Sequence, residues 1–218
     1  MNNIGKAIKL DVLSVMPYMT VKNLVVLVAL GSFYVLLLKT PIMSVVMTQI
    51  FSLMFATYPF MVGDQAGIDP LFKIMGIKSD DVVSGRYLLA FLLIVSMLIV
   101  GIVMAALGSI LYPSENLTST LLSSAATMFI VSSLVVFIQY PIFFKMGYLK
   151  ARTIGMMPFF LIGIAIFAAG RLSFKLQNLV AYVMQHKYIF IFALLAFWCL
   201  AFFVSIVLAK KFYRQRDF

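Results

Sequence analysis

The sequence predicts an all-α membrane protein in which six helices cross the bilayer and both termini face the cytoplasm. First, 64% of the 218 residues are hydrophobic and only 11% are charged, whereas soluble domains carry roughly 25% charged residues. Second, six apolar segments each reach the length of about 17–25 residues that a membrane span requires. Third, the basic residues gather on alternate connections between these segments, which sets the orientation. We therefore treat residues 1–218 as one transmembrane domain.

Residues 1–20 precede the first span and are predicted to form a cytoplasmic amphipathic helix. Apolar residues recur at helical spacing between Ile4 and Met16, while Lys6 and Lys9 lie off this stripe. The stripe consists of Ile4, Ile8, Val12 and Val15. Such a helix lies on the membrane surface; the alternative is an ordinary cytosolic helix.

Six apolar segments follow. They are Val21–Leu38, Pro41–Val62, Tyr87–Leu111, Thr120–Phe144, Thr153–Gly170 and Tyr188–Ala209. Every backbone polar group inside lipid must be paired within the protein, so the segments are predicted to be helices. The alternating strands of about 10 residues that build a membrane β-barrel are absent.

The distribution of lysine and arginine predicts the orientation. Of the 17 basic residues, 13 lie on one set of connections: Lys6, Lys9, Lys22, Lys73, Lys78, Arg86, Lys145, Lys150, Arg152, Lys210, Lys211, Arg214 and Arg216. The other set holds Lys39, Arg171, Lys175 and Lys187. The positive-inside rule places the first set, and with it both termini, in the cytoplasm. This bias accounts for the net charge of +10, so no nucleic-acid partner is expected.

Small and amide residues mark contacts between spans. The second span carries Ser44, Thr48, Ser52 and Ala56 at every fourth position, with Gln49 beside them, and the third carries Gly101, Ala105 and Ser109. Such stripes allow helix backbones to approach closely in lipid. The stripe on the second span serves either packing within this chain or a helix interface or pore shared with another subunit. Gln49 and Gln139 are expected to hydrogen-bond across helices.

Residues 171–187 connect the last two spans on the outer side. Leu172, Leu176, Leu179, Val180 and Val183 share one helical face. This segment is predicted to be a short external amphipathic helix, because it is too polar and too brief to cross the membrane.

Catalytic chemistry is missing from the sequence. No phosphate-binding G-x-x-x-x-G-K-[ST] motif and no metal-ligand spacing occur, and His186 and Cys199 are the only residues of their types. The chain is therefore expected not to be an enzyme by itself and to bind no cofactor or metal directly. The span cores contain no ionisable residue, whereas proton-coupled carriers need one inside the membrane. Any transport is thus expected to draw its energy from another subunit.

Residues 63–86 form the first cytoplasmic connection, which holds four of the seven acidic residues of the chain. Asp69 is predicted to cap a short helix from Pro70 to Met75, and Gly76 to end it. Its apolar residues would be exposed to water, and such a patch indicates docking on a partner. They are Leu71, Phe72, Ile74 and Met75. The alternative is a loop folded against the inner ends of the spans.

The second cytoplasmic connection follows the fourth span. Pro141 is predicted to bend or end that span. Three basic residues, Lys145, Lys150 and Arg152, are expected to hold the connection at the cytosolic surface.

Both connections resemble those of ATP-binding-cassette (ABC) exporter permeases of the type-two superfamily, in the branch with six spans and no attached ATPase. The first connection matches at Asp64, Asp69, Lys78 and Arg86-Tyr87-Leu88. The second matches at Pro141, Phe144, Lys145, Gly147, Lys150, Ala151 and Arg152. One departure is Met75-Gly76, where many members carry Leu-Pro. Among such permeases, the chain resembles those of staphylococcal exporters of phenol-soluble modulins, which are small amphipathic toxic peptides.

The resemblance implies a permease in the bacterial plasma membrane that pairs with a second permease chain, the same or homologous, and with cytosolic ATPase subunits. ATP and magnesium would bind to the ATPase partner. The ATPase contacts would be Asp69, Pro70, Leu71, Phe72, Lys73, Met75 and Lys78. The substrate would be an amphipathic peptide, either a cytolytic peptide or, in related exporters, an antimicrobial peptide of the bacitracin or lantibiotic type.

Two other classes of protein fit the composition. A secondary carrier or channel would need a coupling or gating group, which the spans lack. A membrane immunity or assembly factor that transports nothing fits equally well. Transport that depends on a co-expressed ATPase would separate the three classes.

Overall fold

The computed structural model describes residues 3–18, 20–113, 116–164, 167–168 and 185–216, and these residues form helices and short connections without a strand. In chain order the elements are α1 (Asn3–Val15), the 3-10 helix η1 (Met16–Tyr18), α2 (Val21–Leu38), α3 (Met43–Ala66), α4 (Ile68–Ile74), α5 (Ser79–Leu111), α6 (Leu117–Met146), α7 (Tyr148–Gly155) and α9 (Lys187–Arg214). The all-α class is therefore confirmed.

Five of these helices, α2, α3, α5, α6 and α9, are long and apolar enough to cross a membrane. The remaining predicted span, Thr153–Gly170, falls partly outside the described residues. Its described part contains the end of α7, a turn at Met156 and a helical stretch over residues 157–164. The predicted external helix over residues 171–187 also lies outside the described residues, apart from its last three positions.

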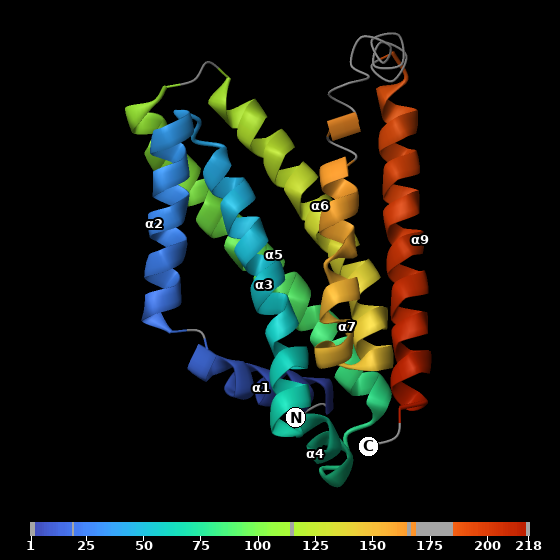
Figure 1. Cartoon of the computed structure of the whole chain (residues 1–218). Coiled ribbons are helices and arrows are strands. Elements are labelled where there is room, and N and C mark those ends of the chain that lie inside the picture. The colour runs from blue at the N-terminus through green and yellow to red at the C-terminus, as the bar shows by residue number, and fades with distance from the viewer. Residues whose placement is uncertain (1–2, 19, 114–115, 165–166, 169–184, 217–218) are drawn as a thin grey trace.

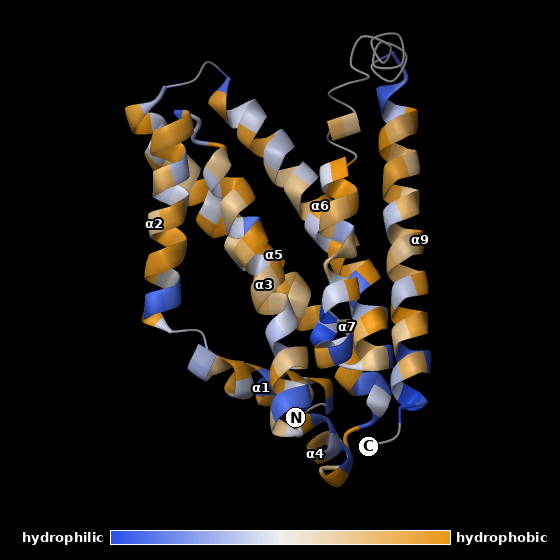
Figure 2. Ribbon diagram, in the orientation of Figure 1, coloured by the Kyte–Doolittle hydropathy of each residue, from blue (hydrophilic) through white to orange (hydrophobic). Residues whose placement is uncertain are grey.

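The long helices form a bundle with two different ends (Figure 1). One end carries α1, α4, α7 and both marked termini, with α1 lying across the ends of the long helices. Hydrophilic residues gather here (Figure 2), and we call it the charged end. The connections from α2 to α3 and from α5 to α6 lie at the opposite end. The connections rich in basic residues thus lie together at one end, as the sequence predicts. That this end faces the cytoplasm stays a prediction.

Two helices extend beyond their apolar runs at the charged end. α5 begins at Ser79, eight residues before the apolar run that starts at Tyr87, because Asp80 and Asp81 stabilise its first turn. α6 continues through Pro141 and ends at Met146, so the expectation that Pro141 could end this span is wrong. Gly147 ends it instead, with φ 76° and ψ 161°, a conformation that is essentially restricted to glycine.

The stripe of small residues on α3 packs against α5. All residues of the stripe, and Gln49 beside it, are buried in this chain: Ser44, Thr48, Gln49, Ser52 and Ala56. A Cβ atom at Gly101 of α5 would lie 2.3 Å from Thr48 Oγ1 and 2.9 Å from Val45 Cα, so only glycine permits this approach. Gln49 Nε2 donates to the carbonyl oxygen of Ile94 at 3.1 Å. The stripe thus packs α3 against α5 within this chain, while a role between subunits stays a prediction.

An aromatic cluster joins α5, α6 and α9 nearer the charged end. Its rings belong to Phe91, Phe129, Phe137, Trp198 and Phe202. Ser205 on α9 donates to the carbonyl oxygen of Phe137 at 2.6 Å and accepts the hydroxyl hydrogen of Tyr87. These contacts fix α9 beside the start of α5, where the candidate site begins.

Candidate coupling site at the charged end

The short helix α4 is the most protruding element of the charged end (Figure 1). It begins at Ile68, after Gly67 turns the chain with φ 64°, so Asp69 lies in its first turn and the predicted capping role of Asp69 is wrong. Met75 closes the helix, and Gly76 follows with φ 66°, as the predicted stop at this glycine requires. The predicted helix is thus present, but it begins two residues earlier, at Ile68, and ends one residue earlier, at Ile74.

The apolar residues of α4 divide between two faces. Ile74 is 82% exposed, and Leu71 and Met75 are also exposed. Phe72, in contrast, is 1% exposed, so the prediction that it lies open to a partner is wrong. Residues three apart share a helix face, and Phe72 therefore turns inward together with Asp69. α4 rests on the bundle through these two side chains and presents the other three.

Arg86 is the buried residue beneath α4. Its Nη2 donates to Asp69 Oδ1 at 2.7 Å, and its Nε donates to Asp11 Oδ2 at 3.3 Å. The guanidinium carbon lies 4.7 Å from the centre of the Phe60 ring and 5.7 Å from the centre of the Phe72 ring. Both ion-pair partners and the ring faces stabilise a charge that is 1% exposed.

Asp11 brings the surface helix α1 into the same arrangement. Burial raises the pKa of the Asp11 carboxyl, and the neighbouring Arg86 guanidinium partly offsets this effect. α1 turns Ala7 and Asp11 inward, while Val12 of the apolar stripe is exposed. A Cβ atom at Gly85 would lie 3.4 Å from that of Ala7, so α1 sits directly on the start of α5.

A second arginine joins the two connections of the charged end. Arg216, in the segment after α9, donates through Nη2 to Asp64 Oδ1 at 2.8 Å and through Nη1 to Asp69 Oδ2 at 3.4 Å. Asp64 also accepts the backbone N–H of Leu149 at 3.1 Å. The end of α3, the start of α4 and the start of α7 are therefore held around one guanidinium.

The other predicted site residues lie at the surface of the charged end. All of them are exposed: Pro70, Lys73, Lys78, Lys145, Lys150 and Arg152. The Lys145 ammonium lies 5.1 Å from the centre of the Phe212 ring, and Arg152 lines a cavity on the side of the bundle. Gln139 donates to the carbonyl oxygen of Gly155 at 2.6 Å and so fixes the end of α7, as the expectation of interhelical hydrogen bonding states.

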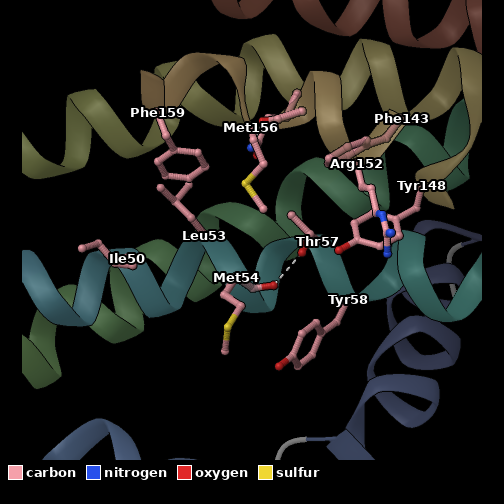
Figure 3. A pocket seen from close by; sticks show the side chains of 12 residues that line it. Ile50, Leu53, Met54, Thr57, Tyr58, Phe143, Tyr148, Arg152, Met156 and Phe159 are labelled. Carbon is pink, nitrogen blue, oxygen red and sulfur yellow. Dashed lines mark hydrogen bonds between the residues drawn. The ribbon is translucent and has the colours of Figure 1, made fainter. Parts of the chain in front are cut away.

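This lateral cavity has a volume of about 320 Å³ and lies between α3, the end of α6, α7 and residues 156–159. Figure 3 shows side chains of α3 facing those of the later helices across it. The lining is mostly apolar, with Leu53, Met54, Met156 and Phe159 among its side chains, and Arg152, Tyr58 and Tyr148 add polar groups. The cavity can hold an apolar group attached to an anionic or hydrogen-bonding one. Within the described residues, no group of three or more histidine, cysteine or acidic side chains is placed to bind a metal ion.

Sequence reasoning missed two residues of this site, Asp11 and Arg216. Neither belongs to a motif, and each finds its partners far along the chain. One signal was available. Acidic residues are so scarce in this sequence, seven in 218, that each one near an apolar segment is expected to face an arginine.

The described residues thus form a bundle of helices long and apolar enough to cross a membrane, with a small ion-paired helix at one end, an arrangement that fits the membrane subunit of a transporter. Residues 8–214 match the family described as ABC-2 family transporter protein, and the chain belongs to this family. It is a multi-pass plasma-membrane protein and a permease subunit of an ABC exporter, a membrane subunit that is distinct from the ATPase with which it associates. No curated protein and no solved structure matches the chain.

Proposed function

We propose that this permease exports amphipathic peptides, that it works as a pair of permease chains with two ATPase subunits, and that α4 receives the movement of the ATPase. One observation carries the proposal. α4 presents three exposed apolar side chains on its outer face and is held from beneath by buried ion pairs. A rigid helix with an exposed apolar tip is suited to transmit force from a docked partner to the spans.

The docking role belongs to Leu71, Ile74 and Met75. Exposed apolar side chains grouped on a protruding element indicate a protein interface, and α4 lies at the end of the bundle away from the apolar mid-section (Figure 2). Ile74, the most exposed of the three, is the expected anchor. Lys73 and Lys78 flank this tip and supply positive charge at its rim.

Ile74→Asp tests the docking role. Loss of an interface anchor typically weakens binding by about 2 kcal/mol, which is roughly thirtyfold in affinity. The measurement is co-purification and titration of the ATPase against the permease in mild detergent. Ile74→Leu is the matched control, because it keeps an apolar group of equal volume. Normal ATPase binding by Ile74→Asp would show that α4 is not the main contact.

The lateral cavity supports an amphipathic substrate. A helix with its side chains is about 10–12 Å across, so a cavity of about 320 Å³ admits one or two large apolar side chains but not a whole helix. Arg152 is the charged residue of the cavity lining, and it can bind an anionic group of the same ligand. Phenol-soluble modulins, suggested by the sequence resemblance, have this amphipathic character; antimicrobial peptides of the bacitracin or lantibiotic type are the second candidate.

Transport in inside-out vesicles tests the energy source and the substrate together. With the cognate ATPase and an amphipathic helical peptide, uptake is expected to need ATP and magnesium and to persist with a protonophore. It should stop when the lysine of the ATPase phosphate-binding motif is replaced. Movement driven by a proton gradient through the permease alone would favour a secondary carrier. Absence of any movement, with normal assembly, would favour an immunity or assembly factor.

A further inference from the structure

Five ionic side chains of the charged end form one continuous series. In order they are Asp11, Arg86, Asp69, Arg216 and Asp64, and we call them the ion-pair chain. The two oxygens of Asp69 accept from different arginines: Oδ1 from Arg86 and Oδ2 from Arg216. Asp69 thus links two groups of ion pairs, which we call arms. The Arg86 arm reaches α1 and α5. The Arg216 arm reaches α3, α7 and the segment after α9.

The two arms differ in burial. The Arg86 and Asp11 side chains are each 1% exposed, and phenylalanine rings cover the guanidinium. In the other arm the Arg216 side chain is 23% exposed, while its partners Asp64 and Asp69 are 10% and 4% exposed. Breaking a buried pair leaves uncompensated charges in a water-poor site and is strongly unfavourable. Separating a pair that water can reach requires far less free energy. The Arg216 arm is therefore the one that can open and close without unfolding the protein.

The turn at Gly147 is shaped to fit the Arg216 arm. A Cβ atom at Gly147 would lie 2.5 Å from Asp64 Oδ2 and 2.7 Å from Arg216 Nη2, so no side chain fits beside this pair. The same turn presents the Leu149 N–H to Asp64. The two connections of the charged end thus meet at the Arg216 guanidinium.

We propose that Arg216 is a positioning residue that acts as a releasable clamp between α4 and α7. While the clamp is closed, displacement of α4 moves α7 and α9 with it, and when it opens α4 moves relative to them. This role rests on the proposed function of α4 as the element that receives ATPase movement. It names the contact through which that movement reaches the later helices.

The first experiment measures the clamp in the permease alone, in lipid nanodiscs. Spin labels replace Ile74 on α4 and Lys150 on α7 in a Cys199→Ser background, and the distance distribution between them is recorded. Arg216→Gln should lose the single narrow maximum of the parent protein. Arg214→Gln is the matched control, because Arg214 is an exposed arginine two residues earlier, at the end of α9, that pairs with Asp80 on α5. An unchanged distribution for Arg216→Gln would overturn the clamp.

The second experiment measures coupling with the cognate ATPase in liposomes, as peptide transported per ATP hydrolysed. Arg216→Gln should lower this ratio by at least about fivefold, the lower end of the usual range for coupled sites, while ATPase binding stays normal. Asp64→Asn should have the same effect, and the double variant should be no worse than either single one. A broadened distance distribution with an unchanged ratio would overturn the role in coupling. If the parent protein itself moves no peptide, the proposed substrate and drive fail, and the distance measurement still decides whether the clamp exists.

Discussion

The helices α3 and α9 are both apolar enough to cross a membrane, yet they occupy opposite environments. In the most apolar stretch of α3, 56% of residues are buried within the chain, against 6% in α9. α3 packs along α5, whereas α9 contributes only Ser205, Ala209 and Tyr213 to the buried interior. Strong hydropathy therefore marks a helix that meets lipid, and it does not mark a helix at the centre of the bundle.

The difference follows from the forces that join helices in lipid. Apolar side chains gain little by leaving hydrocarbon for a protein interior, so association depends on close backbone approach and on hydrogen bonds. α3 offers small and polar side chains at every fourth position, while α9 is lined with large apolar ones. Four substitutions test this explanation, beginning with the largest expected effect.

Gly101→Ala should be the most damaging of the four. The new methyl group would meet Val45 Cα at 2.9 Å, and a backbone atom cannot rotate away. We expect the free energy of unfolding, measured by detergent titration, to fall by about 3 kcal/mol, the upper end for overpacking. Gly163→Ala is the control, because no atom lies within 4 Å of a Cβ built there. Equal stability of the two variants would refute the close-packing argument.

Ser205→Ala tests the main polar contact of α9. It leaves the buried Tyr87 hydroxyl without the acceptor it now has, and an unsatisfied buried group costs about 1–3 kcal/mol. We expect a loss of about 1.5 kcal/mol in the same titration. Ser205→Thr keeps the hydroxyl and should retain most of the stability. A smaller loss in Ser205→Ala than in Ser205→Thr would mean that steric fit, not hydrogen bonding, holds α9.

Gln49→Met removes one hydrogen bond between α3 and α5 while it keeps the side-chain length. Such bonds in membrane helices average about 0.6 kcal/mol, and we expect a loss of that size. Ser96→Ala is the control, because its hydroxyl bonds only to Leu93 in its own helix. A loss as large as that of Gly101→Ala would make hydrogen bonding the dominant force at this interface.

Phe203→Ala should have the smallest effect. This side chain is 68% exposed on the open face of α9, and changes at such positions usually stay within about 0.5 kcal/mol. The measurement is unfolding of the isolated chain, followed by its association state in mild detergent. A larger loss that varies with protein concentration would mean that a second chain covers this face, and α9 would then be an interface helix.

Much of the fold could be predicted because the membrane imposes length and composition. The bounds of α2 are those expected from its apolar run, which Thr20 precedes and Lys39 ends with φ 54°. Hydropathy alone starts the apolar run at Tyr87, whereas Ser79 and the acidic residues Asp80 and Asp81 favour a helix start near Ser79, and α5 does begin there. The helix over residues 153–170 was expected to be continuous, but the turn at Met156 interrupts its described part.

The candidate site was predictable only in its local features. The position of α4 followed from a proline near its start and a glycine after its end. The direction in which Phe72 points did not, because a helix of seven residues is too short to show a periodic face, and Arg86 decides which side turns inward. The arginine partners of Asp11 and Asp64 could not be predicted from local sequence, because they lie 75 and 152 residues away.

The pair between Asp11 and Arg86 also sets an order for biosynthesis. The two residues are 75 positions apart, and chains are made at about 5–20 residues per second. Asp11 therefore exists for about 4–15 s before its partner has been synthesised, and during that time its charge must remain in water. α1 can pack against the start of α5 only after that segment has been synthesised. The first helix to be synthesised is thus among the later ones to pack against the rest of the chain.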